Sequence, residues 1–385
     1  MSFASFFLGG FECSCHTRPD ANRLDLLRST GHDRFAASDY RLLIDHDIRS
    51  ARDGIRWHLI EAEPGRYDWS SLLPMAHAAR QVGMQVVWDL CHYGLPTHID
   101  IWSPHFPDRF ARFAREAALV IADISGAPPT FCAVNEISFW SWAGGEVGRF
   151  GPCAHGRGGE LKRQLVRACI AATRAVRDAV PGARFICAEP AIHIDPGGNA
   201  EPDHVASAEF NRLSQFEAID LLLGRKEPEL GGSPDVIDVI GLNFYPDNQW
   251  YYGGLTIPLG HHAFRPLSVI MQEWWGRFEK PLLLAETGAE GSGRASWLHY
   301  VCGEVREASR LGVPCDGVCI YPILEYQGWE NGRACATGLL SGPDETGTRT
   351  VYGPLATELG VQRALVKDVR SSARRHAAPK LSEAA

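Results

Sequence analysis

Two glutamates, Glu136 and Glu286, are the residues of this sequence best placed to do chemistry together. Each ends a short apolar run, PTFCAVNE and KPLLLAE, of the kind that forms a buried strand. Two carboxyl groups can cleave a glycosidic bond when one is protonated and the other is ionised. The two must then lie in different surroundings, as residues on separate strands do. We therefore interpret Glu136 and Glu286 as a pair of acid and nucleophile.

The elements that must position this pair are predicted by apolar runs with turn signals around them. Eight strand candidates cover residues 5–11, 54–59, 85–91, 130–135, 184–189, 236–245, 281–286 and 317–323. Helical patterns lie between them, for example over residues 38–51, 69–83, 107–124, 159–180, 266–278 and 297–312. We expect Ser38 or Asp39 to cap the first helix, and Gly83 and Gly312 to end two others. Strands and helices that alternate in this way predict an α/β fold, the (β/α)8 TIM barrel.

The connecting segments are unequal in length, and this inequality indicates the functional end of the barrel. Long segments follow strand candidates, at residues 13–37, 138–159, 190–205 and 246–265, whereas short turns precede the second and eighth strands. Barrel enzymes have their active sites at the carboxyl ends of the strands. We therefore predict one domain over residues 1–366 with elaborated loops at the C-terminal face of the strands. The small, polar and charged stretch 367–385 is expected to be a largely disordered tail.

Composition limits the partners that this chain of 385 residues is expected to have. Its formal net charge of −8 argues against nucleic acid or an anionic membrane surface as a partner. No apolar run is long enough to span a bilayer, and no Lys or Arg precedes the apolar start, which we interpret as a strand. The eleven cysteines lie partly in strand candidates and form no C-x-x-C pair, which favours a reduced, cytoplasmic protein without structural zinc.

Polar side chains recur where the predicted strands end. They are Glu12, Arg56, His58, Asp89, His92, Asn135, Glu136, Glu189, Asn243, Tyr245, Glu286, Glu325, Trp329 and Glu330. Any one of them has a structural explanation, because Glu often caps a helix, Asn often lies in a turn and Trp is usually core. Together, at the same end of a barrel, they predict a polar site.

The order of these motifs resembles that of family-1-type retaining β-glycosidases. These enzymes belong to a clan of barrel glycosidases whose catalytic glutamates end strands 4 and 7. The resemblance runs along most of residues 5–335. GIRWHLIEAEPGRYDW resembles the family's strand-2 segment, DLCHYGLPTHI its His-Trp-Asp-Leu-Pro segment, VNE its Asn-Glu motif, GLNFY its strand-6 segment, and LLAETG its Glu-Asn-Gly segment.

The resemblance implies a role for each matched residue. Glu136 is the expected acid/base and Glu286 the expected nucleophile. The expected substrate-binding residues are Glu12, Arg56, His92, Asn135, Asn243, Tyr245 and Trp329. Among these, Arg56 is expected to steady the nucleophile, Tyr245 to bond it, and Asn135 to bind the sugar 2-hydroxyl.

Three positions depart from the family pattern. Ile137 and Thr287 follow the two glutamates where the family usually has Pro and Asn. Glu12 replaces the usual strand-1 Gln, so this position can accept hydrogen bonds when ionised but cannot donate them.

The function implied is that of a retaining, exo-acting β-glycosidase, β-glucosidase-like, that cleaves a terminal sugar by double displacement. The expected partner is a small carbohydrate or glycoside, and the chemistry requires no metal or cofactor. Two alternatives stay open: a glycosidase of the same clan acting on another sugar or an oligosaccharide, and a non-catalytic sugar-binding barrel. Histidines in the loops also suggest a metal-dependent barrel hydrolase, but the H-x-H pair such enzymes often carry on strand 1 is absent from the sequence.

Overall fold

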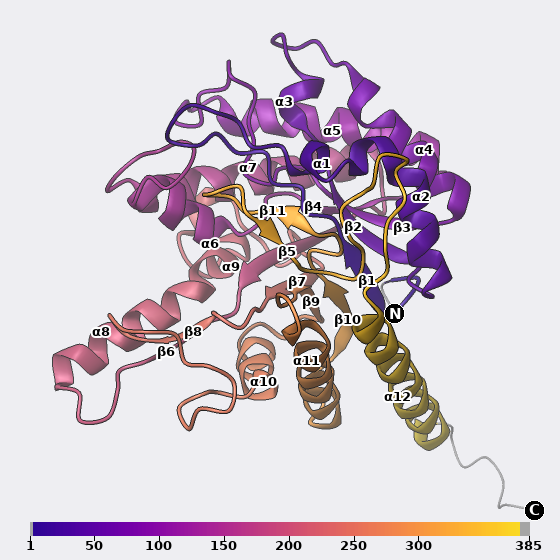
Figure 1. Cartoon of the computed structure of the whole chain (residues 1–385). Helices are drawn as coiled ribbons and strands as arrows, with labels where there is room; N and C mark the ends of the chain where they lie inside the picture. The colour runs from indigo at the N-terminus through magenta and orange to yellow at the C-terminus, as the bar shows by residue number, and fades with distance from the viewer. Residues whose placement is uncertain (1–2, 378–385) are drawn as a thin grey trace, which may run out of the picture.

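The computed structural model describes residues 3–377, with side chains described as far as residue 366, and within them eight parallel strands close into a barrel (Figure 1). The strands are β1 (Phe7–Gly10), β2 (Ser50–Gly54), β3 (Gln85–Asp89), β4 (Thr130–Cys132), β5 (Arg184–Pro190), β7 (Val239–Asn243), β9 (Leu282–Thr287) and β10 (Cys315–Ile320). Each pairs with its neighbour in this order, and β10 pairs with β1 to complete the ring. The predicted α/β barrel is therefore confirmed.

Helices surround the ring of strands (Figure 1). The longer ones are α2 (His32–Asp45), α4 (Leu73–Val82), α5 (Phe106–Ser125), α7 (Gly158–Ala179), α8 (Pro202–Leu213), α10 (Leu267–Phe278), α11 (Gly293–Arg310) and α12 (Gly353–Ala377). The shorter ones are α1 (Leu26–Ser29), α3 (Trp57–Ile60), α6 (Ile137–Trp140) and α9 (Glu217–Leu222). Gly83 ends α4 in a left-handed conformation with φ 71°, as predicted, and Gly312, with φ 89°, follows the end of α11.

The apolar runs form strands because both of their faces are buried. On β9, Leu282, Leu283, Leu284 and Ala285 are all fully buried. Residues on one face fill the barrel interior, and those on the other face pack under the helices. The interior cluster consists of Phe3, Leu8, Val87, Cys132, Ile186, Ala188, Val239, Leu283, Ala285, Cys319 and Tyr321.

The second strand and the first long helix lie earlier in the chain than predicted. The strand was predicted over residues 54–59, but β2 covers 50–54, and residues 57–60 form α3. β2 reads SARDG, and burial of its two charged residues is not visible to an apolar pattern. Likewise α2 begins at His32, so neither Ser38 nor Asp39 caps it; Asp39 is buried and binds Arg349 instead.

Short strands form two additional pairs outside the barrel: β6 (His193–Asp195) with β8 (Gln249–Tyr251), and β11 (Tyr326–Gln327) with β12 (Ala334–Cys335). Together with α8, the pair β6 and β8 makes an arm that projects from the barrel (Figure 1). An open hollow of about 550 Å³, lined in part by His204 and Tyr252, belongs to this arm rather than to the strand ends where the glutamates lie.

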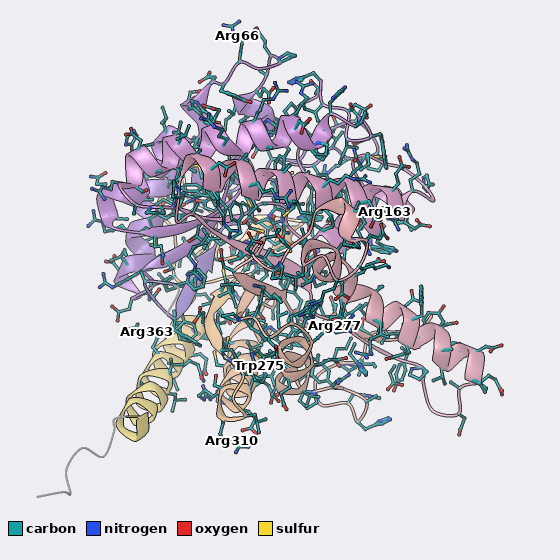
Figure 2. The ribbon with its side chains drawn as sticks, turned by 180° about the vertical axis from the view of Figure 1, so that it is seen from behind. Arg66, Arg163, Trp275, Arg277, Arg310 and Arg363 are labelled. Atoms are coloured by element: carbon teal, nitrogen blue, oxygen red, sulfur yellow. The ribbon has the colours of Figure 1, made fainter. Side chains whose placement is uncertain are left out.

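The carboxyl-terminal helix packs beside α11 and reaches the turn after α2. Arg363, labelled in Figure 2, donates to the carbonyl of His46 and pairs with Asp47. The helix continues to Ala377, through the first part of the stretch 367–385 that was predicted to be a disordered tail; residues 378–385 lie outside the described chain. Among residues 3–377, no helix has both the length and the apolar character that a membrane span requires.

Candidate active site

The two glutamates predicted from sequence lie at the carboxyl ends of β4 and β9 and take their hydrogen bonds from neighbouring strand ends. Glu286 Oε1 accepts from Arg52 Nη1 at 2.6 Å, and its Oε2 accepts from the Tyr245 hydroxyl at 2.8 Å. Glu136 Oε1 accepts from Asn243 Nδ2 at 2.9 Å. Glu286 is only 5% exposed, whereas Glu136 is half-buried. Glu286 therefore lies deeper in the barrel end, and Glu136 lies nearer to solvent.

Glu136 is held in an uncommon backbone conformation. Its φ of 44° and ψ of 64° place it in the left-handed region between β4 and α6. Such a conformation costs a residue with a side chain about 1–3 kcal/mol and persists only where the surroundings enforce it. Here the Glu136 amide donates to the Ala188 carbonyl at 2.9 Å, and the Asn135 amide donates to the Cys91 carbonyl at 3.0 Å. The neighbouring strands thus fix the turn that presents the carboxyl group.

Arg52 on β2 is the cation of the site. It is 1% exposed and binds both oxygens of Asp89, through Nε at 2.9 Å and Nη2 at 2.7 Å. Its Nη2 also donates to Asn135 Oδ1 at 2.7 Å, while Nη1 holds Glu286. A planar guanidinium with five donors can make these bonds at once, which an ammonium group cannot do in the same geometry.

The prediction that Arg56 steadies the nucleophile was therefore wrong, because Arg52 occupies that place. Arg56 lies beyond the end of β2, at the residue before α3, and its ion pairs are with aspartates rather than with Glu286. It pairs with Asp25 at 3.3 Å and with Asp33 at 2.8 Å. The error follows from the shifted strand: with β2 ending at Gly54, the arginine that faces the barrel centre comes four positions earlier.

The other predicted sugar-binding residues of strands 3 and 4 meet beside this arginine. His92 Nδ1 bonds Asp89 Oδ2 at 2.9 Å, and its Nε2 accepts from Asn135 Nδ2 at 3.0 Å. This pattern corresponds to a neutral imidazole that carries its proton on Nδ1. Burial lowers the pKa of His92, but the bond to Asp89 and the charge of Glu12 raise it more, so that the net shift is upward.

Glu12 and Trp329 border the site on other sides. Glu12 is 6% exposed, and its Oε1 accepts from both the amide, at 2.9 Å, and the hydroxyl of Ser14. His92 Nε2 lies 3.9 Å from the same oxygen. The Trp329 ring lies 4.8 Å from the His16 ring and 5.7 Å from the Tyr93 ring. Four residues of the predicted polar site have partners outside this group: Arg56 and His58 lie beside Asp25, Glu325 lies near Arg294, and Glu330 pairs with Arg149.

Besides Arg52, the sequence-based prediction left out Tyr93, and it named Glu189 only as one of the polar residues at strand ends. Tyr93, which follows His92, donates to Glu136 Oε2 at 2.6 Å; its only sequence signal was its place in the DLCHYGLP segment. Glu189 ends β5, is fully buried and accepts from the Ser138 amide at 3.1 Å. Burial raises the pKa of Glu189 to about 7, and its charge in turn raises the pKa of Glu136.

One group of possible metal ligands lies within the site. Ligand atoms of Cys13, Asp89 and His92 all lie within 4.8 Å of one another. Both oxygens of Asp89 are bound to Arg52, and the Cys13 sulfur lies 3.1 Å from the same His92 nitrogen that bonds Asp89. A cation would therefore have to compete with Arg52 for Asp89, so these donors fit the hydrogen-bonded network better than they fit a metal ion.

Comparison with known proteins identifies the fold. No protein-family model and no curated protein matches the chain. Among solved structures, it is similar to the family 1 β-glucosidase from Thermotoga maritima, with a TM-score of 0.74 and 16% identity over 92% of this chain and 97% of that one. It is also similar to the AHE enzyme from Alicyclobacillus herbarius, with a TM-score of 0.73 and 17% identity over 87% of each chain. The β-glycosidase BGL167 aligns with a TM-score of 0.67 and 19% identity over 89% of this chain and 88% of that one.

These similarities show that the chain has the fold of the family 1 β-glucosidases, as the order of its motifs predicted. At these identities they establish the architecture alone, since one fold can carry different activities.

Proposed function

We propose that this protein is a retaining, exo-acting β-glycosidase in which Glu286 is the nucleophile and Glu136 is the acid/base. The observation that carries the proposal is the asymmetry of the two carboxyl groups. Glu286 is bonded to the cation Arg52, whereas the side chains that donate to Glu136 are the neutral Tyr93 and Asn243. The Thermotoga maritima enzyme of the same fold has been solved with isofagomine lactam and with deoxynojirimycin, which supports a sugar-like ligand here.

The asymmetry decides which carboxyl group holds a proton. The pKa of Glu286 is raised to about 7, because burial and the charge of Glu136 raise it by more than Arg52 lowers it. Burial also raises the pKa of Glu136. Two carboxyl groups that interact titrate as a pair, and between the two steps of this titration the pair holds one proton. We place that proton on Glu136, because Arg52 and the Tyr245 hydroxyl both stabilise the charged form of Glu286.

The reaction then follows the two steps of a retaining glycosidase. A carboxylate oxygen of Glu286 attacks the anomeric carbon, and the bond from that carbon to the leaving oxygen breaks as Glu136 gives its proton to the leaving oxygen. Glu136 next removes a proton from water, which displaces Glu286 and releases the sugar. The exposure of the two residues suits these roles, since the departing group and the water must approach the more open Glu136.

The non-catalytic alternative is less well supported. A barrel that only binds sugar has no need to hold Glu136 in a left-handed conformation or to bury a carboxylate against Arg52. Both features cost stability in the absence of a reaction. The proposal also covers a glycosidase of the same clan that acts on another sugar. The contacts of Glu136 and Glu286 support the reaction and do not select the sugar.

A panel of aryl β-glycosides tests the proposed reaction, with product configuration followed by NMR and with Glu136→Ala measured beside the wild type. We expect hydrolysis with retention of configuration. We also expect Glu136→Ala to slow substrates with poor leaving groups by about 10²- to 10⁴-fold, and activated aryl glycosides much less, since a good leaving group needs little protonation. Glu146→Ala, whose carboxylate caps the start of α7, is the matched control.

Inversion of configuration would exclude the double displacement. Equal losses along the leaving-group series would remove Glu136 from the acid role, provided that the deglycosylation step is shown not to limit the rate.

A second prediction concerns sugar preference. Because Ser14 occupies one oxygen of Glu12, we expect the other to accept from a substrate hydroxyl. Glu12→Gln keeps an acceptor for Ser14 but puts donors on the other side. The variant should change kcat/KM by about tenfold on the preferred substrate and alter the ranking of gluco-, galacto-, fuco- and xylo-configured aryl glycosides. An unchanged ranking with unchanged kcat/KM would make Glu12 a residue of the loop alone.

A further inference from the structure

Tyr93 connects the two halves of the proposed active site. Its hydroxyl donates to Glu136 Oε2 at 2.6 Å and accepts from Asn135 Nδ2 at 3.0 Å. Asn135 Oδ1 accepts from Arg52 Nη2 at 2.7 Å, and Arg52 Nη1 donates to Glu286 at 2.6 Å. One continuous chain of hydrogen bonds therefore runs from the proposed nucleophile to the proposed acid/base, and Tyr93 is its last member before Glu136.

The backbone and the ring of Tyr93 are both held in place for this contact. Its φ of 66° lies in the left-handed region, which a bulky residue adopts only where the surroundings enforce it. The side chain is 2% exposed, and its ring packs against those of Trp140, Phe150 and Trp329 at 5.2–5.7 Å. Rings on several sides thus leave the hydroxyl little freedom except along its bonds to Asn135 and Glu136.

A phenol suits position 93 because of its hydrogen-bonding capacity. A tyrosine hydroxyl can donate one hydrogen bond and accept another at the same time, and Tyr93 does both. The His-Trp-Asp-Leu-Pro segment that this part of the chain resembles has Trp here, and an indole N–H is a donor only. The double contact is therefore a property of this chain.

We propose that Tyr93 is the positioning residue of the acid/base. Its hydroxyl holds Oε2 of Glu136 while Asn243 holds Oε1, and through Asn135 and Arg52 it ties the orientation of Glu136 to that of Glu286. This role rests on the proposed function of the two glutamates, and Tyr93 itself acts through Glu136 without reacting.

Loss of the Tyr93 hydroxyl should change the pKa of Glu136 in a known direction. A hydrogen bond donated to a carboxylate stabilises its charged form, so that removing the bond raises the pKa of the carboxyl group. Burial raises the pKa of Glu136, and the bonds from Tyr93 and Asn243 lower it. An acid must be protonated to work, so its pKa sets the alkaline limb of the activity profile. The limb should therefore move to higher pH in Tyr93→Phe.

The other ionisable side chains that act on Glu136 are Glu189 at the end of β5, Glu286 on β9 and His92 after β3. Tyr93→Phe changes none of these groups and keeps the aromatic ring, so that the packing is preserved. Tyr300→Phe is the matched control, because it removes a phenol that accepts from the Leu267 amide between α10 and α11.

The experiment titrates the Glu136 carboxyl carbon by ¹³C NMR in the full chain, with the signal assigned by its loss in Glu136→Gln, and measures the pH profile of kcat/KM in parallel. In Tyr93→Phe we expect the pKa of Glu136 to rise by about one unit. We also expect kcat/KM at neutral pH to fall about 10- to 100-fold on substrates with poor leaving groups, as the acid loses its position. In a Glu136→Ala background, Tyr93→Phe should cost nothing further.

A second variant is expected to shift the pKa of Glu136 in the opposite direction. Incorporation of 3,5-difluorotyrosine at position 93 keeps the ring and makes the phenol a stronger donor, so that the pKa of Glu136 should fall instead of rise. The proposal is overturned if the pKa of Glu136 is the same in all Tyr93 variants, or if Tyr93→Phe loses as much activity without Glu136 as with it. The titration needs no substrate, so failure to hydrolyse any glycoside would count against the proposed function alone.

Discussion

Glu286→Ala is expected to lose kcat on the order of 10⁴- to 10⁶-fold, comparable to the loss of one residue of a catalytic triad. The barrel should nevertheless stay folded. Arg52 loses one partner in this variant but keeps both oxygens of Asp89 and the amide oxygen of Asn135, so that no buried cation is left unpaired. Glu290→Ala is a suitable control, because its carboxylate follows on the same loop and pairs with the exposed Arg333.

Azide should restore turnover to the alanine variant. A small anion can enter the space that the carboxylate leaves and attack the anomeric carbon directly. The product should be a glycosyl azide of inverted configuration, since only one displacement then takes place. Full activity in Glu286→Ala without azide would exclude Glu286 as the nucleophile, and a retained configuration of the azide would require another nucleophile in the site.

The barrel was predictable from sequence because burial on both faces of a parallel strand leaves a continuous apolar run. Seven of the strands coincide with such runs closely enough to place their ends, and Glu136 and Glu286 could be read at two of those ends. β2 was misplaced because it is not apolar: it buries two charged residues, Arg52 and Asp53. The cost of that burial is offset by partners from other strands and helices, among them Asp89 and His32.

Tyr93 was missed and Asp39 was misassigned because their partners are distant in the chain. Tyr93 meets Glu136 only through the left-handed turn after β3. Asp39, predicted as a possible helix cap, is bound instead by Arg349 from the segment between β12 and α12. Such contacts form when the barrel closes. Sequence periodicity and turn signals report only local structure, so they cannot predict these contacts.

Arg52→Lys and Arg56→Lys are expected to differ strongly in activity. The comparison shows whether Glu286 depends on Arg52, its partner in the structure, or on Arg56, which the sequence motif indicated. A lysine at position 52 cannot bind Asp89 through two donors and still reach Glu286 and Asn135, because its ammonium group is a single point of charge. We expect kcat/KM to fall about 10²- to 10³-fold in Arg52→Lys. Lysine is the better test, since an uncharged residue would leave Asp89 and Glu286 as buried carboxylates without a cation, at a cost of about 3–5 kcal/mol.

The pH profile supplies a second readout with a definite sign. Arg52 lowers the pKa of Glu286, so that a weaker contact lets this pKa rise. A nucleophile must be ionised, and the acidic limb of kcat/KM should therefore move to higher pH in Arg52→Lys. Arg56→Lys can keep its pairing with Asp25 and Asp33, and should leave both the limb and the rate within about threefold of the wild type. If the two variants lost activity equally, or only Arg56→Lys moved the limb, the nucleophile would be under the control of Arg56, and the network centred on Arg52 would serve stability alone.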